Sequence, residues 1–465
     1  MVFLTLPNFT DLDFNFQRSM LEYYEIILVP IYWILLLKIT VRILKKRGDN
    51  EITLAKKALN LKFIGAILGT LIFNLYYPGG DTTAYYNDGR LLNSIFLHDP
   101  IIGLRMFFTG GNEDSWASDL LPIIDNFRFA IPANTWLVCK FAAFLEFFCF
   151  RSMLVTSMLF AHISFFCLWR FYKKINEIFP QIKKYSPYAI FYVPSLVLWG
   201  SGILKDTICI SALALLFVSV HQIFFKKEKV FKWLLLGLYS AYLLAVIKSY
   251  ILLSFGGAIM IWVSFSYVEK NKSAFRQLVS KIIISLGVLV IFAIGIAKVG
   301  TQIIQSQIEE ILKQSTMTGQ YLKFVATKND GSVYDIGTIE PTLGSFAKKM
   351  PAAINVTLFR PYIWESRKPI MLFSALESTA ILLLFLYVLF KSRVYRFIGL
   401  IIKNSFITFC FIYTVIFATF VGISSFNFGT LVRYKIPCLP FFLLMLFLIL
   451  AESKKKKSPL PEPAQ

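Results

Sequence analysis

The stretch SFITFCFIYTVIFATFVGI, residues 405–423, contains no charged side chain and is long enough to cross a lipid bilayer as one α-helix. Runs of similar character, about 16 to 21 residues long, recur along most of the chain. The sequence therefore predicts an all-α integral membrane protein with about eleven transmembrane helices. We expect these helices at 24–44, 59–77, 152–171, 188–203, 207–224, 231–247, 250–268, 280–299, 371–390, 405–423 and 435–451.

The composition supports a single membrane domain. Of the 465 residues, 57% are hydrophobic and only 16% are charged, which is unusual for a soluble domain. We predict one polytopic domain over residues 1–451, followed by a basic and disordered tail at 452–465. The formal net charge of +21 could indicate a nucleic-acid partner, but the cations fall in short clusters between apolar runs, as in cytoplasmic loops. A nucleic-acid partner is therefore not expected.

Clusters of lysine and arginine predict the orientation of the chain in the membrane. Two apolar runs separate each cluster from the next, so every cluster can lie on the same, cytoplasmic side. The N-terminus then lies outside, the C-terminus lies in the cytoplasm, and two long segments, about 78–150 and 300–370, form outer loops. The clusters are Lys45 to Arg47, Lys173-Lys174, Lys226-Lys227, Lys270 to Arg276, Lys391 to Arg396 and Lys454 to Lys457.

The first outer loop begins with a candidate catalytic carboxylate. Pro78-Gly79-Gly80 ends the second apolar run and leaves Asp81 just beyond the outer membrane surface, where it can meet a substrate from lipid or from water. The alternative is structural, because an aspartate after glycines commonly caps a helix, here one opened by Thr82-Thr83. Both roles stay open, and one residue can fill both.

Charged residues also occur at the expected outer turns of several hairpins. Lys205 and Asp206 follow the fourth run, Lys248 separates the sixth from the seventh, and Arg433 precedes the last. Such charges are costly near hydrocarbon unless they are paired or functional. A Lys205–Asp206 pair solvated at the interface is the structural alternative. The functional interpretation is a cluster of cations that binds a phosphate beside a carboxylate that acts as a base.

Two further features concern acids. Glu377 lies near the outer end of the ninth run, and an ionisable residue in a membrane segment is a functional candidate, with Arg360 or Lys368 as its expected partner. A metal site has little support, because hard cations need clustered oxygen ligands and only Glu113 and Asp114 are adjacent acids in the first outer loop.

Four short motifs carry a family resemblance. They are Gly80-Asp81 after an early membrane helix, P-x(n)-G-x-x-K-D from Pro194 to Asp206, G-L-x(n)-K-S-Y from Gly237 to Tyr250, and R-Y-x-x-P-x-x-P from Arg433 to Pro440. Together they resemble the membrane-embedded GT-C glycosyltransferases, which use polyprenyl-phosphate sugars and include protein O-mannosyltransferases and the aminoarabinose transferases of lipid A. The resemblance covers most of the chain in layout but few residues in detail.

The resemblance implies a GT-C-like fold and a glycosyltransferase that acts on the outer side of a bacterial inner membrane. Asp81 would be the catalytic base, with Asp88 as a less favoured substitute. The partners implied are a polyprenyl-phosphate-linked sugar donor, membrane lipids, and a glycan, lipid or protein acceptor. Some members of the family work without metal, so no cofactor is required and a divalent cation stays open. The substrate-binding candidates are Lys205, Asp206, Lys248, Arg360, Glu377 and Arg433.

Two other functions remain as alternatives. A polysaccharide polymerase or ligase would also place cations at the outer turns, but typically with arginine or histidine in the catalytic role. A transporter or lipid flippase belongs to another class, whose members usually show internal repeats and broken helices that meet at mid-membrane. The sequence shows no such repeat. A one-sided outer cavity would support the enzyme, whereas a path through the bilayer would support the transporter.

Overall fold

The computed structural model of the chain describes residues 21–76, 80–111, 115–269, 273, 275–277, 279–284, 287, 334–337, 343–366, 369–425 and 427–455. Regular structure in these ranges is helical, without a β-strand. Seven of the described helices are long and apolar enough to cross a membrane, or eight if a bent pair near the C-terminus counts as one span. The all-α, multi-pass membrane character is therefore confirmed, whereas the count of eleven is not.

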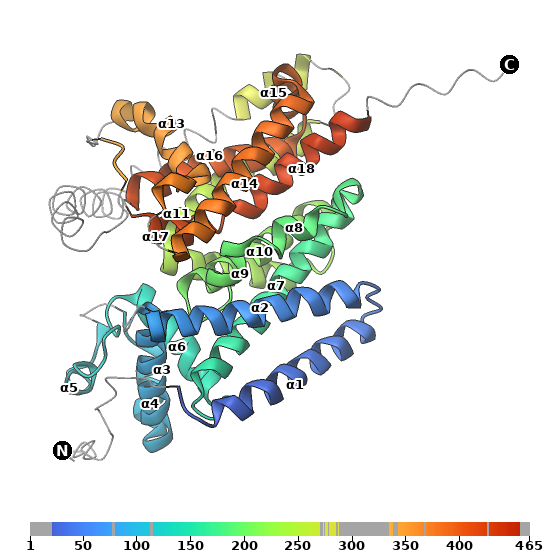
Figure 1. Cartoon of the computed structure of the whole chain (residues 1–465). Coiled ribbons are helices and arrows are strands. Elements are labelled where there is room, and N and C mark those ends of the chain that lie inside the picture. Colours follow the sequence, from blue (N-terminus) through green and yellow to red (C-terminus); the bar gives the residue numbers. More distant parts are fainter. Residues whose placement is uncertain are drawn as a thin grey trace. The chain divides into compact units, whose positions relative to one another are not determined.

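The chain divides into two compact units, which we describe separately (Figure 1). The first unit contains the described parts of residues 1–169, 197–212 and 246–248, and the second contains those of residues 170–196, 213–245 and 249–465. The helices of the N-terminal half are α1 (Glu25–Lys46), α2 (Ile52–Leu71), η2 (Ile72–Tyr76), α3 (Asp81–His98), α4 (Pro100–Phe108), α5 (Leu121–Ile124), α6 (Ala133–Glu146), α7 (Met153–Ile178), η4 (Pro180–Ile182), α8 (Ser186–Ile190), α9 (Pro194–Trp199), α10 (Lys205–His221) and η5 (Gln222–Lys226).

The remaining helices begin with α11, the longest one. They are α11 (Val230–Val268), α13 (Leu343–Phe359), η6 (Ile363–Glu365), α14 (Pro369–Ser392), α15 (Val394–Lys403), α16 (Ser405–Ser424), α17 (Phe428–Tyr434) and α18 (Leu439–Lys455).

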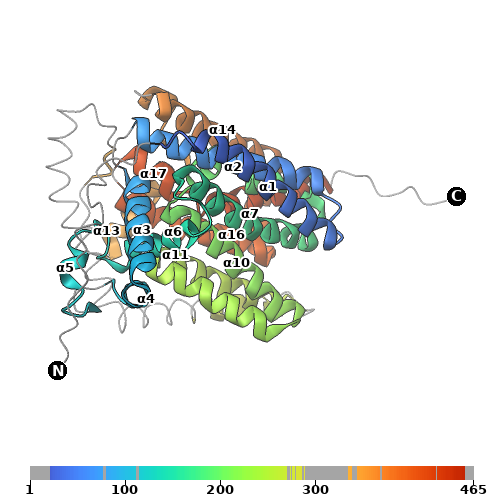
Figure 2. The same cartoon turned by 90° about the horizontal axis from the view of Figure 1, so that it is seen from below.

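In the first unit, α1 and α2 form a hairpin and lie side by side in two views (Figures 1 and 2). Trp33 Nε1 of α1 donates to Asn60 Oδ1 of α2 at 2.9 Å. Beyond η2 the chain turns, and α3 packs closely along α6. A Cβ at Gly89 of α3 would lie 2.7 Å from the Cβ of Ala142, so only glycine allows this approach. The α3–α6 pair therefore forms a fixed platform at the end of α2.

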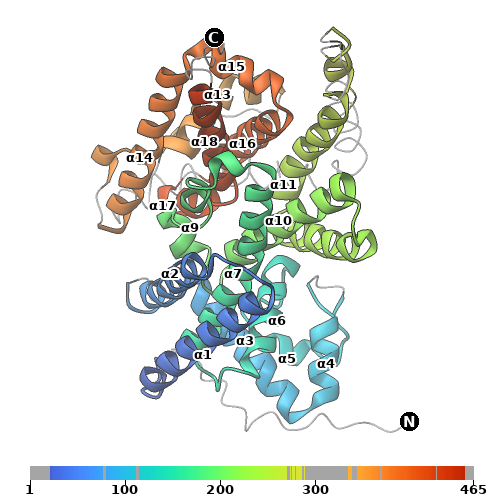
Figure 3. The same ribbon diagram turned by 90° about the vertical axis from the view of Figure 1, so that its right-hand side faces the viewer.

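The second unit has an aromatic core. Phe217 stacks on Trp262 at 5.2 Å between ring centroids, and Phe255 meets Phe441 at 5.6 Å. Helices α14, α16 and α18 lie together in this unit (Figure 3). Such offset and edge contacts favour one arrangement of the helices, because aromatic pairs add energy beyond the apolar area that they bury.

Helix α11 is sharply bent at the residue where the sequence predicted a turn between two separate crossings. Its backbone leaves helical geometry at Lys248, with φ −149° and ψ 80°. Ser219 of α10 lies against Gly237, before the bend, while Phe217 stacks on Trp262, after it. A straight helix would separate residues 237 and 262 by about 37 Å. Both arms therefore pack on the same stretch of α10, in agreement with the two runs predicted at 231–247 and 250–268.

Other predicted crossings differ from the structure. The run 188–203 is not a continuous span, because α8 ends at Ile190 and α9 starts only at Pro194. Proline lacks the backbone N–H and disfavours helical geometry at the preceding residue, which explains the break. The last run, predicted at 435–451, covers a break and most of α18, and α18 forms a bent pair with the preceding α17 at 64°.

Several predictions lie outside the described residues. These are the eighth crossing beyond residue 287, the second outer segment up to residue 333, the acids Glu113 and Asp114, the cation Lys368, and the tail from residue 456.

Candidate functional site

Asp81 is the first residue of α3. Gly80, which has no side chain, occupies the N-cap position. The structural alternative, that Asp81 is the N-cap residue, is therefore wrong, because Asp81 lies one residue later. In the first turn it still interacts favourably with the positive end of the helix dipole. A Cβ at Gly80 would lie 2.2 Å from Phe73, so the chain passes tightly against η2 before Asp81.

Lys205 interacts electrostatically with Asp81 although 124 positions separate them in the sequence. The Lys205 ammonium donates to Asn134 Oδ1 at 3.0 Å. Lys205 is the first residue of α10, Asn134 lies in the first turn of α6, and Asp81 opens α3. The N-terminal ends of three helices of the first unit therefore come together here, and the positive ends of their dipoles favour an anion.

Asp206 and Lys248 form a buried ion pair in the same place. Lys248 Nζ donates to Asp206 Oδ1 at 2.5 Å. Asp206 is 0% exposed and Lys248 is 9% exposed. The alternative of a Lys205–Asp206 pair solvated at the interface is therefore wrong, since Asp206 is buried and its partner is Lys248. The bend of α11 at Lys248 lets this side chain reach the start of α10.

Two ammonium groups share this site with one buried carboxylate. Lys248 and Lys205 repel each other electrostatically, while Asp81 and Asp206 attract Lys205. Asp206 pairs with Lys248, so the Lys205 ammonium, which donates to Asn134 and is attracted by Asp81, is the second cation of the cluster. We call Asp81, Lys205, Asp206 and Lys248 the lysine cluster.

Asp88 is buried in α3 and fixes a loop. Its Oδ2 accepts the N–H of Phe129 at 2.7 Å and its Oδ1 accepts that of Arg128 at 3.2 Å. Burial raises the pKa of the Asp88 carboxyl to about 6, although both hydrogen bonds act in the opposite direction. This placement suits a structural role, and the catalytic role predicted for Asp88 stays a prediction.

The candidates of the second unit have other partners than expected. The Arg360 guanidinium forms a bidentate pair with Glu365, with Nε at 3.0 Å from Oε1. Glu377 accepts the N–H and the hydroxyl of Ser195 at 2.6 and 2.8 Å. The expected Glu377–Arg360 pair is therefore wrong. Arg433 lies in the last turn of α17 and is half-buried.

Sequence reasoning missed several buried ionisable residues, among them two lysines and a glutamate. Lys62 of α2 is 1% exposed and donates to Ser164 Oγ, Gly200 O and Ser201 Oγ. Lys435 is 0% exposed, donates to Ser378 Oγ at 2.8 Å and interacts electrostatically with Glu377. The signal for both was a lysine inside an apolar run.

Glu146, at the end of α6, is the third missed residue. It is 3% exposed, and within the described ranges neither of its carboxylate oxygens accepts a hydrogen bond. Burial raises the pKa of this carboxyl to about 8, whereas the charges of Arg90 and Arg151 act in the opposite direction.

Comparison of the chain with protein-family models, with curated proteins and with solved structures gives no significant match. Among the described residues, no three His, Cys, Asp or Glu side chains are grouped closely enough to hold a metal ion.

Proposed function

We propose that this chain is a membrane glycosyltransferase that moves a sugar from a polyprenyl-phosphate-linked donor to a glycan, lipid or protein acceptor. The observation that supports this proposal is the lysine cluster at the meeting point of three helix starts. The Lys205 ammonium is aligned by Asn134, and Asp81 lies within its electrostatic reach. A cation, helix N-termini and a carboxylate are the groups that transfer from a phosphate carrier requires.

In this proposal Lys205 holds the donor phosphate, and Asp81 acts as the base. The oxygen of an acceptor hydroxyl bonds to the anomeric carbon as the bond from that carbon to the phosphate oxygen breaks. The bonding electrons leave with the polyprenyl phosphate, whose charge Lys205 and the helix N-termini stabilise. The hydroxyl proton passes to the Asp81 carboxylate. Asp206 keeps the Lys248 ammonium in place beside them.

Three further candidate residues lie in the second unit. Independently of the lysine cluster, Arg433, Arg360 and Glu377 are proposed as substrate-binding residues of the second unit. Arg360 is already paired with Glu365, and its guanidinium lies 5.1 Å from the centre of the Phe428 ring. A ligand phosphate would have to compete with Glu365 for this side chain.

The orientation belongs to the same proposal. The N-terminus would lie outside and the C-terminus in the cytoplasm of a bacterial inner membrane, which places the acidic loop with Asp81 on the outer side. Cysteine-accessibility labelling tests this arrangement. Cysteines introduced at Asn112 and Ser332 should react with an impermeant reagent added outside, and reaction only from the cytoplasm would contradict both the topology and the outer site.

Donor binding by the purified protein tests the function. Lys205→Gln should weaken the binding of a polyprenyl-phosphate sugar by about tenfold or more, because a charge-assisted hydrogen bond to phosphate is lost. Lys57→Gln is the matched control, since Lys57 is an exposed lysine of the same unit. Unchanged donor affinity of Lys205→Gln would overturn the proposal, and lipid translocation without sugar transfer would support the flippase alternative.

A further inference from the structure

Helix α15 lies between two candidate membrane spans and is joined to each by a single residue. Helix α14 ends at Ser392, Arg393 has a positive φ of 61° with ψ 139°, and α15 begins at Val394. At the other end only Asn404 separates α15 from α16. The spans on either side are Met371–Ser392 and Ser405–Ser424. Helix α15 is about 15 Å long, so these short turns hold it at one boundary of the membrane.

The faces of α15 differ in chemistry. Phe397 is buried, and its ring centre lies 6.0 Å from that of Phe385 in α14. Four apolar or aromatic side chains point away from the protein and are exposed. At 100° per residue they fall within an arc of about 100°. They are Val394, Tyr395, Ile398 and Ile402.

Cations flank this exposed apolar face. The stretch from Lys391 to Asn404 contains four cations and no carboxylate. Arg393 and Arg396 both interact with the Tyr395 hydroxyl, and these two guanidiniums lower the pKa of that group. The Arg396 guanidinium lies 5.7 Å from the centre of the Tyr395 ring. Two guanidiniums thus meet at one phenol, at the edge of the exposed apolar face.

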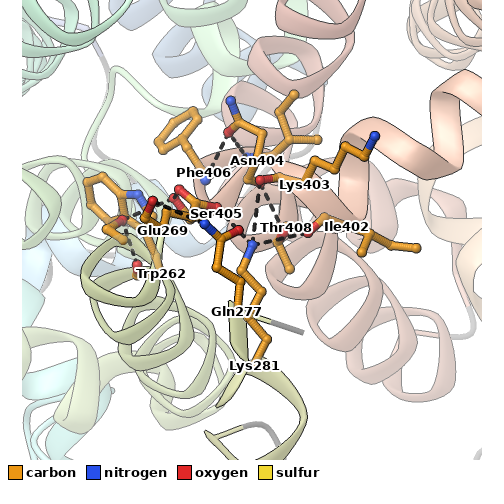
Figure 4. Close-up of polar contacts among 12 residues, drawn as sticks. Trp262, Glu269, Gln277, Lys281, Ile402, Lys403, Asn404, Ser405, Phe406 and Thr408 are labelled. Carbon is orange, nitrogen blue, oxygen red and sulfur yellow. Dashed lines mark hydrogen bonds and ion pairs between the residues drawn. The ribbon is translucent and has the colours of Figure 1, made fainter. Parts of the chain in front are cut away.

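A polar cluster fixes the end of α15 (Figure 4). Lys281 Nζ donates to the carbonyl of Ile402 at 3.2 Å and to Glu269 Oε1 at 2.9 Å. Asn404 Oδ1 accepts the N–H of Phe406 at 3.0 Å and so caps α16. Because Lys281 satisfies a terminal carbonyl of α15, the helix is fixed before any ligand binds.

We propose that α15 is an interfacial helix whose guanidiniums Arg393 and Arg396 bind the headgroup phosphate of an anionic phospholipid. The exposed apolar side chains enter the region of the acyl chains, and arginine binds phosphate through two parallel hydrogen bonds. The neighbouring spans place the cations at headgroup depth, which favours a lipid over a soluble anion. This inference is independent of the proposed glycosyltransferase activity.

The test is a lipid titration of the purified full-length protein followed by native mass spectrometry. Phosphatidylglycerol should bind more tightly than phosphatidylcholine. Arg393→Gln with Arg396→Gln should weaken phosphatidylglycerol binding by about 30-fold, at about fivefold for each cation near the surface. Arg393→Lys with Arg396→Lys should restore part of the affinity, because the charge returns without the planar donor pair.

The matched control is Lys227→Gln with Lys229→Gln, which removes two exposed cations from the turn before α11. It should leave the affinity within about twofold, as expected for exposed charges outside α15 at physiological salt. An equal loss in this control would overturn the proposal, because bulk charge would then explain the binding. An unchanged α15 variant, or displacement of the lipid by inorganic phosphate alone, would overturn it as well.

Discussion

Replacing one member of the Asp206–Lys248 pair should lower the free energy of unfolding more than replacing both members together. Asp206→Asn leaves the Lys248 ammonium in a place that is 9% exposed, and Lys248→Met leaves the fully buried Asp206 carboxylate without its partner at 2.5 Å. Each single substitution should lower the free energy of unfolding by about 3–5 kcal/mol, the usual cost of an uncompensated buried charge. The loss for Asp206→Asn should lie at the lower end of this range, because an amide oxygen can still accept a hydrogen bond from the lysine ammonium.

The double variant distinguishes a buried ion pair from two side chains that contribute to stability independently. Asp206→Asn with Lys248→Met leaves no unpaired charge, so its destabilisation should be no larger than about 3 kcal/mol. Equilibrium unfolding in mixed micelles measures all four members of the cycle, with Lys57→Met as an exposed control that should change stability by less than about 0.5 kcal/mol. A double variant whose loss equals the sum of the two single losses would refute the buried pair.

Three further predictions use the same unfolding measurement. Lys62→Met should be neutral or stabilising by about 1–3 kcal/mol, because all three acceptors of this buried ammonium are neutral and do not compensate for its removal from water. A clear loss of stability would show that these three hydrogen bonds outweigh the cost of burying the ammonium. The wild-type free energy of unfolding should fall as the pH rises from about 5 through about 8, because the Glu146 carboxyl, whose pKa burial raises to about 8, must then lose its proton inside the folded protein. Glu146→Gln should remove this part of the pH dependence. An unchanged profile in this variant would contradict the raised pKa of Glu146. Glu377→Ala should cost about 2–4 kcal/mol and Glu377→Gln less, since the amide can still accept from Ser195, so equal losses in the two variants would show that these hydrogen bonds contribute little.

The local pattern of the chain predicted the elements more successfully than their contacts. The uncharged run 405–423 is α16, and the lysine between the runs 231–247 and 250–268 is where α11 bends. Both follow from the energetic cost of polar groups in hydrocarbon, which the sequence shows directly. Pro194 in the run 188–203 signalled its break, but the length of the apolar run outweighed this signal in the prediction.

Partners of charged residues could not be predicted in the same way. Asp206 is 42 positions from Lys248, and Glu377 is 182 positions from Ser195. The sequence offered the adjacent Lys205 as a partner for Asp206, yet adjacent residues of a helix point in different directions. Only the fold of the chain decides which distant side chain neutralises a buried charge.

The most direct test of the proposed function is the sugar-transfer rate of purified Asp81→Asn protein. The amide keeps the shape of the side chain and removes its basicity, so a catalytic base predicts a loss of turnover of about a hundredfold or more, with donor affinity nearly unchanged. Asp88→Asn is the comparison, because Asp88 already accepts two backbone N–H groups in the interior. Near-normal transfer by Asp81→Asn, together with a large loss in Asp88→Asn, would contradict the account and assign the base to Asp88.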